Sequence, residues 1–321
     1  MIQVSVIMPC YNASQYIGEA IQSVQSQSFI DWELLIVDDG STDDSAQIVQ
    51  GYVARDTRIR LIQQSNSGAC RARNNGIEHA RGEFIKFLDA DDLLESNCLQ
   101  DQVCQIQSLQ LNQIPFGDYY NIDKDGKIVS EYKFNKHQEL KNDQVFFFFS
   151  EWRILISAPL HRTCLLRKIN GFDESLKRGQ ESDMHLRLAL ADVEFVYRPC
   201  ITFRYRDHNA STRISEQYHE GTQVLQQFRR QRTQMVEQQL KERYDIVPAK
   251  YNPYFAKMWF SYAREWFSKG DTAMGNQYMR RACQYGLYTR FQRSYNWIGG
   301  IVGFELVEKI LQLRLKLLHK K

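Results

Sequence analysis

The stretch FIKFLDADDLL, residues 84–94, joins an apolar run to a dense group of carboxylates. Its apolar part reads as a buried strand, and Asp89, Asp91 and Asp92 follow where that strand leaves the core. Like charges this close repel one another and shift one another's pKa unless a positive charge neutralises them. The stretch therefore predicts either a solvated loop that caps the next helix or a site for a cation.

The residues before this stretch alternate between strand and helix patterns. We expect strands over 4–9, 32–39, 59–64 and 83–92, and helices over 16–27, 41–53 and 68–80. Such alternation predicts right-handed crossovers and a parallel sheet with helices on its faces. Ligands of these sheets bind beyond the carboxyl ends of the strands. The segments Pro9–Asn12, Asp38–Asp39 and Asp89–Asp92 follow three strand ends and are expected to share one site.

The residue types in these segments indicate a nucleotide and a metal. An Asp-x-Asp pair offers hard oxygen ligands that suit Mg²⁺ or Mn²⁺, and a diphosphate can complete the coordination shell. Asp39 is expected to accept hydrogen bonds from a nucleobase. Arg71 and Arg73, in GACRARNNG, are placed to meet a nucleotide or its phosphates.

Two long segments carry a family resemblance. VSVIMPCYNASQYIGEAIQSVQSQSFIDWELLIVDDGSTD (4–43) and NSGACRARNNGIEHARGEFIKFLDADD (66–92) resemble the nucleotide-diphospho-sugar domain of the family 2 glycosyltransferases. The resemblance covers roughly residues 2–215. It implies the GT-A fold, a Rossmann-like α/β architecture whose mostly parallel sheet has helices on both faces. We therefore expect a GT-A domain over 1–215 and an all-helical C-terminal region over 216–321.

The resemblance also implies residue roles on the donor side. Pro9, Tyr11 and Asn12 would wall the base and ribose pocket. Asp39 would contact the pyrimidine edge, and Arg73 would approach the nucleotide.

For the metal, the resemblance places Asp89 near the ribose and the ion, and makes Asp91 the main protein ligand. Asp92 would support the donor sugar or the acceptor pocket. His208, in YRDHNASTR, would approach the metal or the diphosphate; its alternative is a surface loop residue.

The expected general base lies in GQESDMHLRLA. Many relatives have Glu-Asp where this chain has Gln180 and Glu181, six residues before an Arg, here Arg187. Glu181 is therefore the candidate base, and Asp183 is the alternative. The structural alternative for Glu181 is that it only caps the helix. Phe172, in NGFDE, is expected to shape the acceptor pocket.

These roles imply an inverting transfer from a nucleotide sugar, with UDP as the expected nucleotide, Mn²⁺ or Mg²⁺ as cofactor and no covalent intermediate. The acceptor would be a glycan or a lipid-linked carrier, in bacterial surface polysaccharide synthesis. The alternative is a non-catalytic sugar-nucleotide-binding or assembly module with a helical docking tail. A dinucleotide oxidoreductase is disfavoured, because PCYNAS follows the first strand in place of G-x-G-x-x-G.

The C-terminal region has a separate character. Residues 254–271 and 273–286 read as an aromatic helix pair that resembles one tetratricopeptide unit. Residues 280–321 hold nine Lys or Arg and two acidic residues, so the terminal helix is expected either on an anionic membrane surface or packed on the catalytic domain or a partner chain, including a second copy.

Composition narrows the class further. A formal net charge of +3 gives no sign of nucleic-acid binding. Seven scattered Cys without a C-x-x-C pattern indicate reduced thiols, and so a cytoplasmic protein, peripheral to the membrane at most. No uncharged apolar run of about 18 residues occurs, so no membrane span is expected.

Overall fold

The computed structural model describes residues 2–149, 153–207 and 223–287, together with scattered positions between 292 and 308. The chain forms two compact units, Met1–Gln217 and Tyr218–Lys321. The first is an α/β structure and the second is helical.

Five strands form the main sheet of the first unit in the order β3-β2-β1-β4-β8. Their bounds are β1 Val4–Cys10, β2 Trp32–Asp38, β3 Ile59–Gln63, β4 Phe84–Phe87 and β8 His161–Arg162. The first four pair in parallel, and β8 runs antiparallel to β4. Every residue of β2 and β4 is buried, because helices cover both faces of a parallel sheet.

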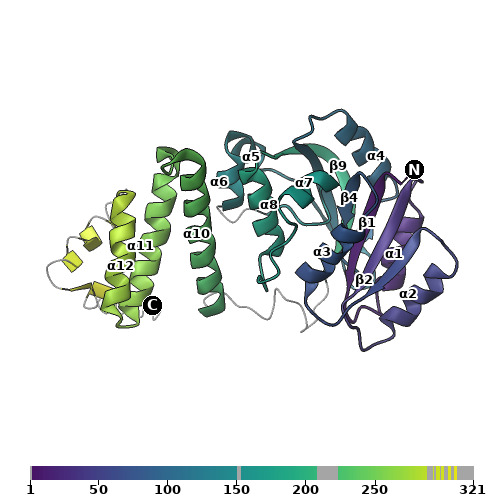
Figure 1. Cartoon of the computed structure of the whole chain (residues 1–321), viewed down its shortest axis with the longest axis horizontal. Helices are drawn as coiled ribbons and strands as arrows, with labels where there is room; N and C mark the ends of the chain where they lie inside the picture. Colours follow the sequence, from purple (N-terminus) through teal and green to yellow (C-terminus); the bar gives the residue numbers. More distant parts are fainter. Residues whose placement is uncertain are drawn as a thin grey trace. The chain divides into compact units, whose positions relative to one another are not determined.

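Three helices connect the parallel strands: α1 Ile17–Gln25, α2 Ser45–Val53 and α3 Ala69–His79. α3 packs on β1 and β2, and α1 and α2 lie on the opposite face (Figure 1). α3 approaches β1 closely at Gly76, where an added Cβ would lie 2.4 Å from Cγ2 of Ile7. This arrangement leaves the carboxyl ends of β1, β2 and β4 open for a site.

A second sheet has the order β5-β9-β6-β7. Its strands are β5 Leu93–Leu94, β6 Gln113–Ile122, β7 Ile128–Tyr132 and β9 Glu194–Arg206. β6 and β7 form a hairpin whose turn is closed by Asp123, since its Oδ1 accepts from the backbone N–H groups of Asp125 and Lys127 at 3.0 Å. Through β5 and β9, this sheet reaches the loop that follows β4.

The remaining helices of the first unit are α4 Cys98–Gln107, α5 His137–Asn142, α6 Gln144–Phe149, α7 Thr163–Lys168 and α8 Gln180–Leu190. α8 packs against α6 and β9. Its His185 stacks on His161 of β8, with ring centroids 5.7 Å apart. α8 is therefore anchored to β8, an edge strand of the main sheet.

The second unit consists of α10 Gln223–Tyr244, the short 3₁₀ helix η1 Ala249–Tyr251, α11 Asn252–Ser268 and α12 Thr272–Gln284. Trp259 of α11 is fully buried and stacks on Tyr278 of α12. Glu237 of α10 accepts from the Tyr285 hydroxyl at 2.6 Å and from Arg281 at 3.0 Å. The predicted helix pair is thus present, and its resemblance to a tetratricopeptide unit stays a prediction.

The architecture confirms the predicted α/β class with a helical C-terminal region. Within the described ranges, no helix is both long and apolar enough to cross a membrane. The basic segment 309–321, on which the membrane and docking hypotheses depend, lies outside the described residues.

Candidate active site

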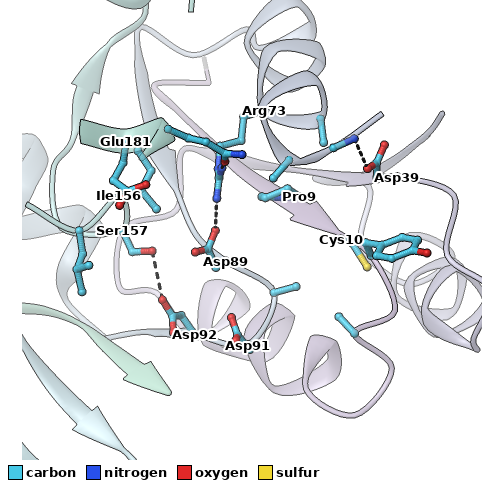
Figure 2. A pocket seen from close by; sticks show the side chains of 18 of the residues that line it. Pro9, Cys10, Asp39, Arg73, Asp89, Asp91, Asp92, Ile156, Ser157 and Glu181 are labelled. Atoms are coloured by element: carbon cyan, nitrogen blue, oxygen red, sulfur yellow. Dashed lines mark hydrogen bonds and ion pairs between the residues drawn. The ribbon is translucent and has the colours of Figure 1, made fainter. Parts of the chain in front are cut away.

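A cavity of about 940 Å³ opens beyond the carboxyl ends of β1, β2 and β4. Its walls come from the segments that follow these strands, from α3 and from the start of α8. Nine of the predicted site residues line it: Pro9, Tyr11, Asn12, Asp39, Arg73, Asp89, Asp91, Asp92 and Glu181. In Figure 2, Asp39 and Glu181 lie toward opposite sides of the site, with Arg73 and Asp89 between them.

The loop after β4 holds its three carboxylates in different ways. The Asp92 amide donates to the Asp89 carbonyl at 3.1 Å, which closes a tight turn. Asp92 is buried, and its carboxylate accepts from the Arg206 amide at 3.0 Å and from the Ser157 hydroxyl at 3.4 Å. Asp89 and Asp91 are partly exposed and line the cavity. Asp92 therefore fixes the loop, and the other two carboxylates meet the ligand space.

Arg73 links this loop to α8. Its Nη2 donates to Asp89 at 2.7 Å and its Nη1 donates to the Gln180 side-chain oxygen at 3.0 Å (Figure 2). Burial alone would lower the pKa of Arg73, but Asp89 and the nearby charge of Glu181 outweigh burial and raise that pKa. Arg73 therefore keeps a permanent positive charge in the middle of the cavity.

Asp39 directly follows β2 and holds the loop before α3. Its Oδ1 accepts from Gln64 at 2.7 Å and from the Ser67 amide at 2.8 Å, and its Oδ2 accepts from the Gly68 amide at 2.8 Å. An ionised carboxylate has about four acceptor positions, so capacity for a ligand N–H remains.

The segment after β1 is tied to the segment after β2 through Asn12. The backbone N–H of Asn12 donates to the Ser41 hydroxyl at 3.0 Å, and the side-chain oxygen of Asn12 accepts from the backbone N–H of Thr42 at 2.8 Å. These contacts hold Asn12 at a φ of 49°, a left-handed conformation that Asn tolerates better than most residues. Tyr11 is 51% exposed and presents its ring at the cavity wall.

Cys10 lines the cavity without nucleophilic character. Burial raises the pKa of its thiol to about 11, so the thiolate is a minor form at neutral pH. The site therefore gives no support to covalent catalysis by this cysteine.

The first turn of α8 places Glu181 in the cavity wall, while Asp183 is absent from it. Asp183 is buried and bonded to Arg187 at 2.8 Å, four residues further along the helix. The structure thus separates the two candidate bases: Glu181 can meet a ligand, and Asp183 supports the helix.

Phe172 also lies outside the cavity lining. It is buried, packs edge-on against Phe87, and has the Arg73 guanidinium 5.4 Å from its ring centroid. Its contacts support Arg73, and its expected role in shaping the acceptor pocket stays a prediction. His208, the third residue predicted for the metal, lies outside the described residues.

The cavity wall contains carboxylates that could coordinate a divalent ion. Among the residues the structure describes, no three His, Cys, Asp or Glu side chains gather to enclose an ion. Asp89 and Asp91 still offer hard oxygen ligands at one cavity, and Mg²⁺ commonly uses one or two carboxylates together with substrate phosphates and water. The residues therefore fit an ion that binds together with a diphosphate.

Several cavity residues were not anticipated from the sequence. Four cations line the site beside Arg73: Lys124, Arg153, Lys177 and Arg178. Lys177 and Arg178 lie just before Gly179, the N-cap of α8, so their position close to the candidate base could have indicated a role. Lys124 and Arg153 lie on distant loops and carry no local signal.

As a whole, the cavity can hold a polar, anionic ligand. It pairs cations with partly exposed carboxylates and places one further carboxylate, Glu181, at the start of a helix. This set suits charge stabilisation on a leaving phosphate together with removal of a proton.

Several known proteins are related to this chain in sequence. A family model described as glycosyl transferase family 2 matches residues 5–160. The glycosyltransferase GlyG of Streptococcus pneumoniae serotype 4 is 31% identical over 227 residues, which cover 66% of this chain and 73% of that protein. The glycosyltransferase EpsJ of Bacillus subtilis is 33% identical over 192 residues, covering 57% of this chain and 55% of that protein.

Solved structures show the same fold. The crystal structure of S. aureus TarS 1–349 in complex with UDP-GlcNAc has a TM-score of 0.60 and 19% identity, covering 90% of this chain and 93% of that one. The likeness confirms the predicted GT-A architecture. Together with the sequence relatives, it places the protein: the chain belongs to glycosyltransferase family 2.

Proposed function

We propose that this glycosyltransferase transfers a sugar from a nucleotide-diphospho-sugar, with UDP as the expected nucleotide, to an acceptor hydroxyl by single displacement with inversion. One observation carries the proposal: a single cavity collects Asp39 after β2, Asp89 and Asp91 after β4, and Glu181 at the start of α8. These positions supply a nucleotide contact, a phosphate and metal region, and a base.

On the donor side, Asp39 accepts the N–H of the pyrimidine edge with the capacity that its loop contacts leave. Pro9, Tyr11 and Asn12 wall the base and ribose. Arg73 approaches the nucleotide, while its bond to Asp89 keeps that carboxylate near the ribose.

The leaving group is a nucleoside diphosphate, which needs positive charge as it departs. Bound with the donor, Mn²⁺ or Mg²⁺ supplies Lewis-acid stabilisation of that charge. Asp91, with Asp89, would hold the ion. Lys177 and Arg178 add fixed positive charge to the same cavity.

The acceptor side is formed around Glu181. Its carboxylate takes the proton of the attacking hydroxyl, which reaches the anomeric carbon from the side opposite the diphosphate. Asp92 supports the sugar pocket indirectly, because it fixes the loop that carries Asp89 and Asp91.

The relatives support a role in polysaccharide synthesis. TuaG of Bacillus subtilis, named as a teichuronic acid biosynthesis glycosyltransferase, is 46% identical over 101 residues, covering 31% of this chain and 40% of that protein. Chondroitin synthase of Escherichia coli is 30% identical over 189 residues, but the chain spans only 26% of it. We infer a glycan or lipid-linked acceptor in a bacterial surface polysaccharide pathway.

The test is Glu181→Gln, which keeps the size of the side chain and removes its basicity. We expect kcat for sugar transfer or donor hydrolysis to fall by about 100-fold or more, since general-base catalysis contributes on that scale. Donor affinity, measured by calorimetry with Mn²⁺ present, stays near that of the wild type.

The control is Asp183→Asn at the ion pair with Arg187. This change lowers the melting temperature and leaves kcat close to normal at a permissive temperature. Activity that survives Glu181→Gln and disappears with Asp183→Asn reverses the base assignment. Donor binding without turnover in the wild type, across a panel of nucleotide sugars and acceptors, favours the alternative of a non-catalytic sugar-nucleotide-binding module.

A further inference from the structure

Arg206, the last residue of β9, is fully buried next to the loop after β4 that carries Asp89, Asp91 and Asp92. Its Nε donates to the Asp91 carbonyl at 2.9 Å and its Nη1 donates to the Lys124 carbonyl at 2.9 Å. Its Nη2 donates to Glu19 of α1 at 2.6 Å. One guanidinium thus ties three chain segments together.

Two more contacts complete the arrangement. The backbone N–H of Arg206 donates to the Asp92 carboxylate at 3.0 Å. The backbone and the side chain of Arg206 thus bond two neighbouring residues of the same loop, Asp92 and Asp91. The guanidinium carbon lies 4.7 Å from the ring centroid of Tyr16, which lines the cavity. The planar fork of Arg suits several fixed acceptors at once, and Lys cannot reproduce it.

We propose that Arg206 is a positioning residue for the metal–diphosphate region: it fixes the Asp91 backbone so that the Asp91 carboxylate faces the cavity. The inference rests on the proposed function, in which Asp91 holds the divalent ion. Arg206 does not line the cavity; it acts through the residues it holds, chiefly Asp91 and Asp92. Burying a cation here is tolerable because Glu19 neutralises it and the two carbonyls accept further N–H donors of the guanidinium.

The physical consequence concerns how firmly the Asp91 carboxylate is held in place to meet the ion. A carboxylate on a loop free to shift meets an ion in fewer of its conformations, so metal affinity in the ternary complex falls. Residues that hold metal ligands in place commonly contribute about 10–100-fold to metal affinity or activity. We expect Arg206 to contribute on the same scale.

The experiment compares Arg206→Met, Arg206→Lys and Glu19→Gln with Arg204→Met in the full chain. Arg204 is the matched control: it lies two residues earlier on β9, pairs with Glu95 at 2.5 Å and makes no bond to residues 89–92 that the structure records. Two quantities are measured: amide hydrogen exchange over residues 88–94 in the absence of ligand, and the Mn²⁺ concentration that half-saturates nucleotide-sugar binding.

We expect Arg206→Met to speed exchange at residues 89–92 and to raise the half-saturating Mn²⁺ concentration about tenfold or more. Arg206→Lys gives intermediate values, Glu19→Gln gives smaller shifts in the same direction, and Arg204→Met matches the wild type. If Arg206→Met does not fold, Arg206→Lys and Glu19→Gln decide the question.

The inference is overturned if exchange at 89–92 and the Mn²⁺ requirement stay at wild-type values while only the melting temperature falls. Failure of the proposed function has a different signature: the wild type itself then binds nucleotide sugar without any Mn²⁺ dependence. The exchange measurement needs no ligand, so it judges Arg206 in that case too.

Discussion

At the scale of single residues, the cavity is defined by carboxylates that directly follow buried strands. Asp39, Asp89 and Asp91 follow buried strands, and the structure brings them to one cavity because parallel strands end at the same edge. Glu181 lies there as well. The three aspartates were predictable because the local sequence carries both the residue type and its position after a strand, whereas Glu181 was expected from the family resemblance.

Other contacts in and around the site were not predictable, and the reason is sequence distance. Arg206 bonds a residue 115 positions away, and Arg73 reaches Gln180 across 107 positions. Asp183 did carry a local signal: its spacing of four from Arg187 is typical of a helical ion pair, which argues for a structural role.

Arg73 gives a prediction at this scale. Arg73→Met leaves Asp89 without its cation and removes the bond to Gln180. Breaking a buried ion pair costs about 3–5 kcal/mol, and because the Asp89 side chain is 36% exposed we expect about 2 kcal/mol of lost unfolding free energy in urea titrations. The affinity of the Arg73→Met variant for the donor should fall as well.

The control on the same helix is Arg71→Met, where both members of the pair with Glu174 are more than 40% exposed. Such pairs contribute about 0–1 kcal/mol. Equal losses from the two substitutions contradict the central position assigned to Arg73.

At the scale of elements, the predicted strands and helices of the first hundred residues are present, with differences at their ends. The helix expected from residue 41 begins at Ser45, because Ser41 and Thr42 are engaged by Asn12 from another strand end. The strand expected to reach residue 92 ends at Phe87, and Leu93 and Leu94 form a separate short strand with β9. Tertiary contacts decided both boundaries.

The packing of α8 predicts a pH effect. Burial lowers the pKa of His185 to about 3 and, together with the charges of His185 and Lys86, holds the pKa of His161 well below its usual range. The folded state keeps both rings neutral, while the unfolded chain takes up protons below about pH 6.5. The unfolding free energy should therefore fall as the pH is lowered from about 6.5 toward 3.

His185→Phe tests this directly, since aromatic rings already surround the position. Urea titrations from pH 7 to pH 5 should show a slope smaller by up to about 1.4 kcal/mol per pH unit in the variant. The same substitution at the exposed His79 is the control. Parallel curves for His185→Phe and the wild type argue against the assignment.

At the scale of the whole molecule, composition and the order of elements predicted an α/β unit followed by helices. The structure contains both, as compact units Met1–Gln217 and Tyr218–Lys321. The proposed chemistry lies wholly in the first unit, and the role of the second stays a prediction. Aromatic periodicity predicts helices but does not identify the partner they contact.

The central claim is that Asp39, beyond β2, contacts the base of a nucleoside diphosphate, and that Asp89 and Asp91, beyond β4, hold its phosphates through a divalent ion. Calorimetric titration with UDP, GDP and dTDP, with Mn²⁺ and again after chelation by EDTA, tests it most directly. We predict that one nucleotide, with UDP as the expected one, binds in the presence of Mn²⁺. Its affinity should fall at least about tenfold both on chelation and in Asp91→Asn. Equal affinity before and after chelation, with Asp91→Asn binding as tightly as the wild type, contradicts the account.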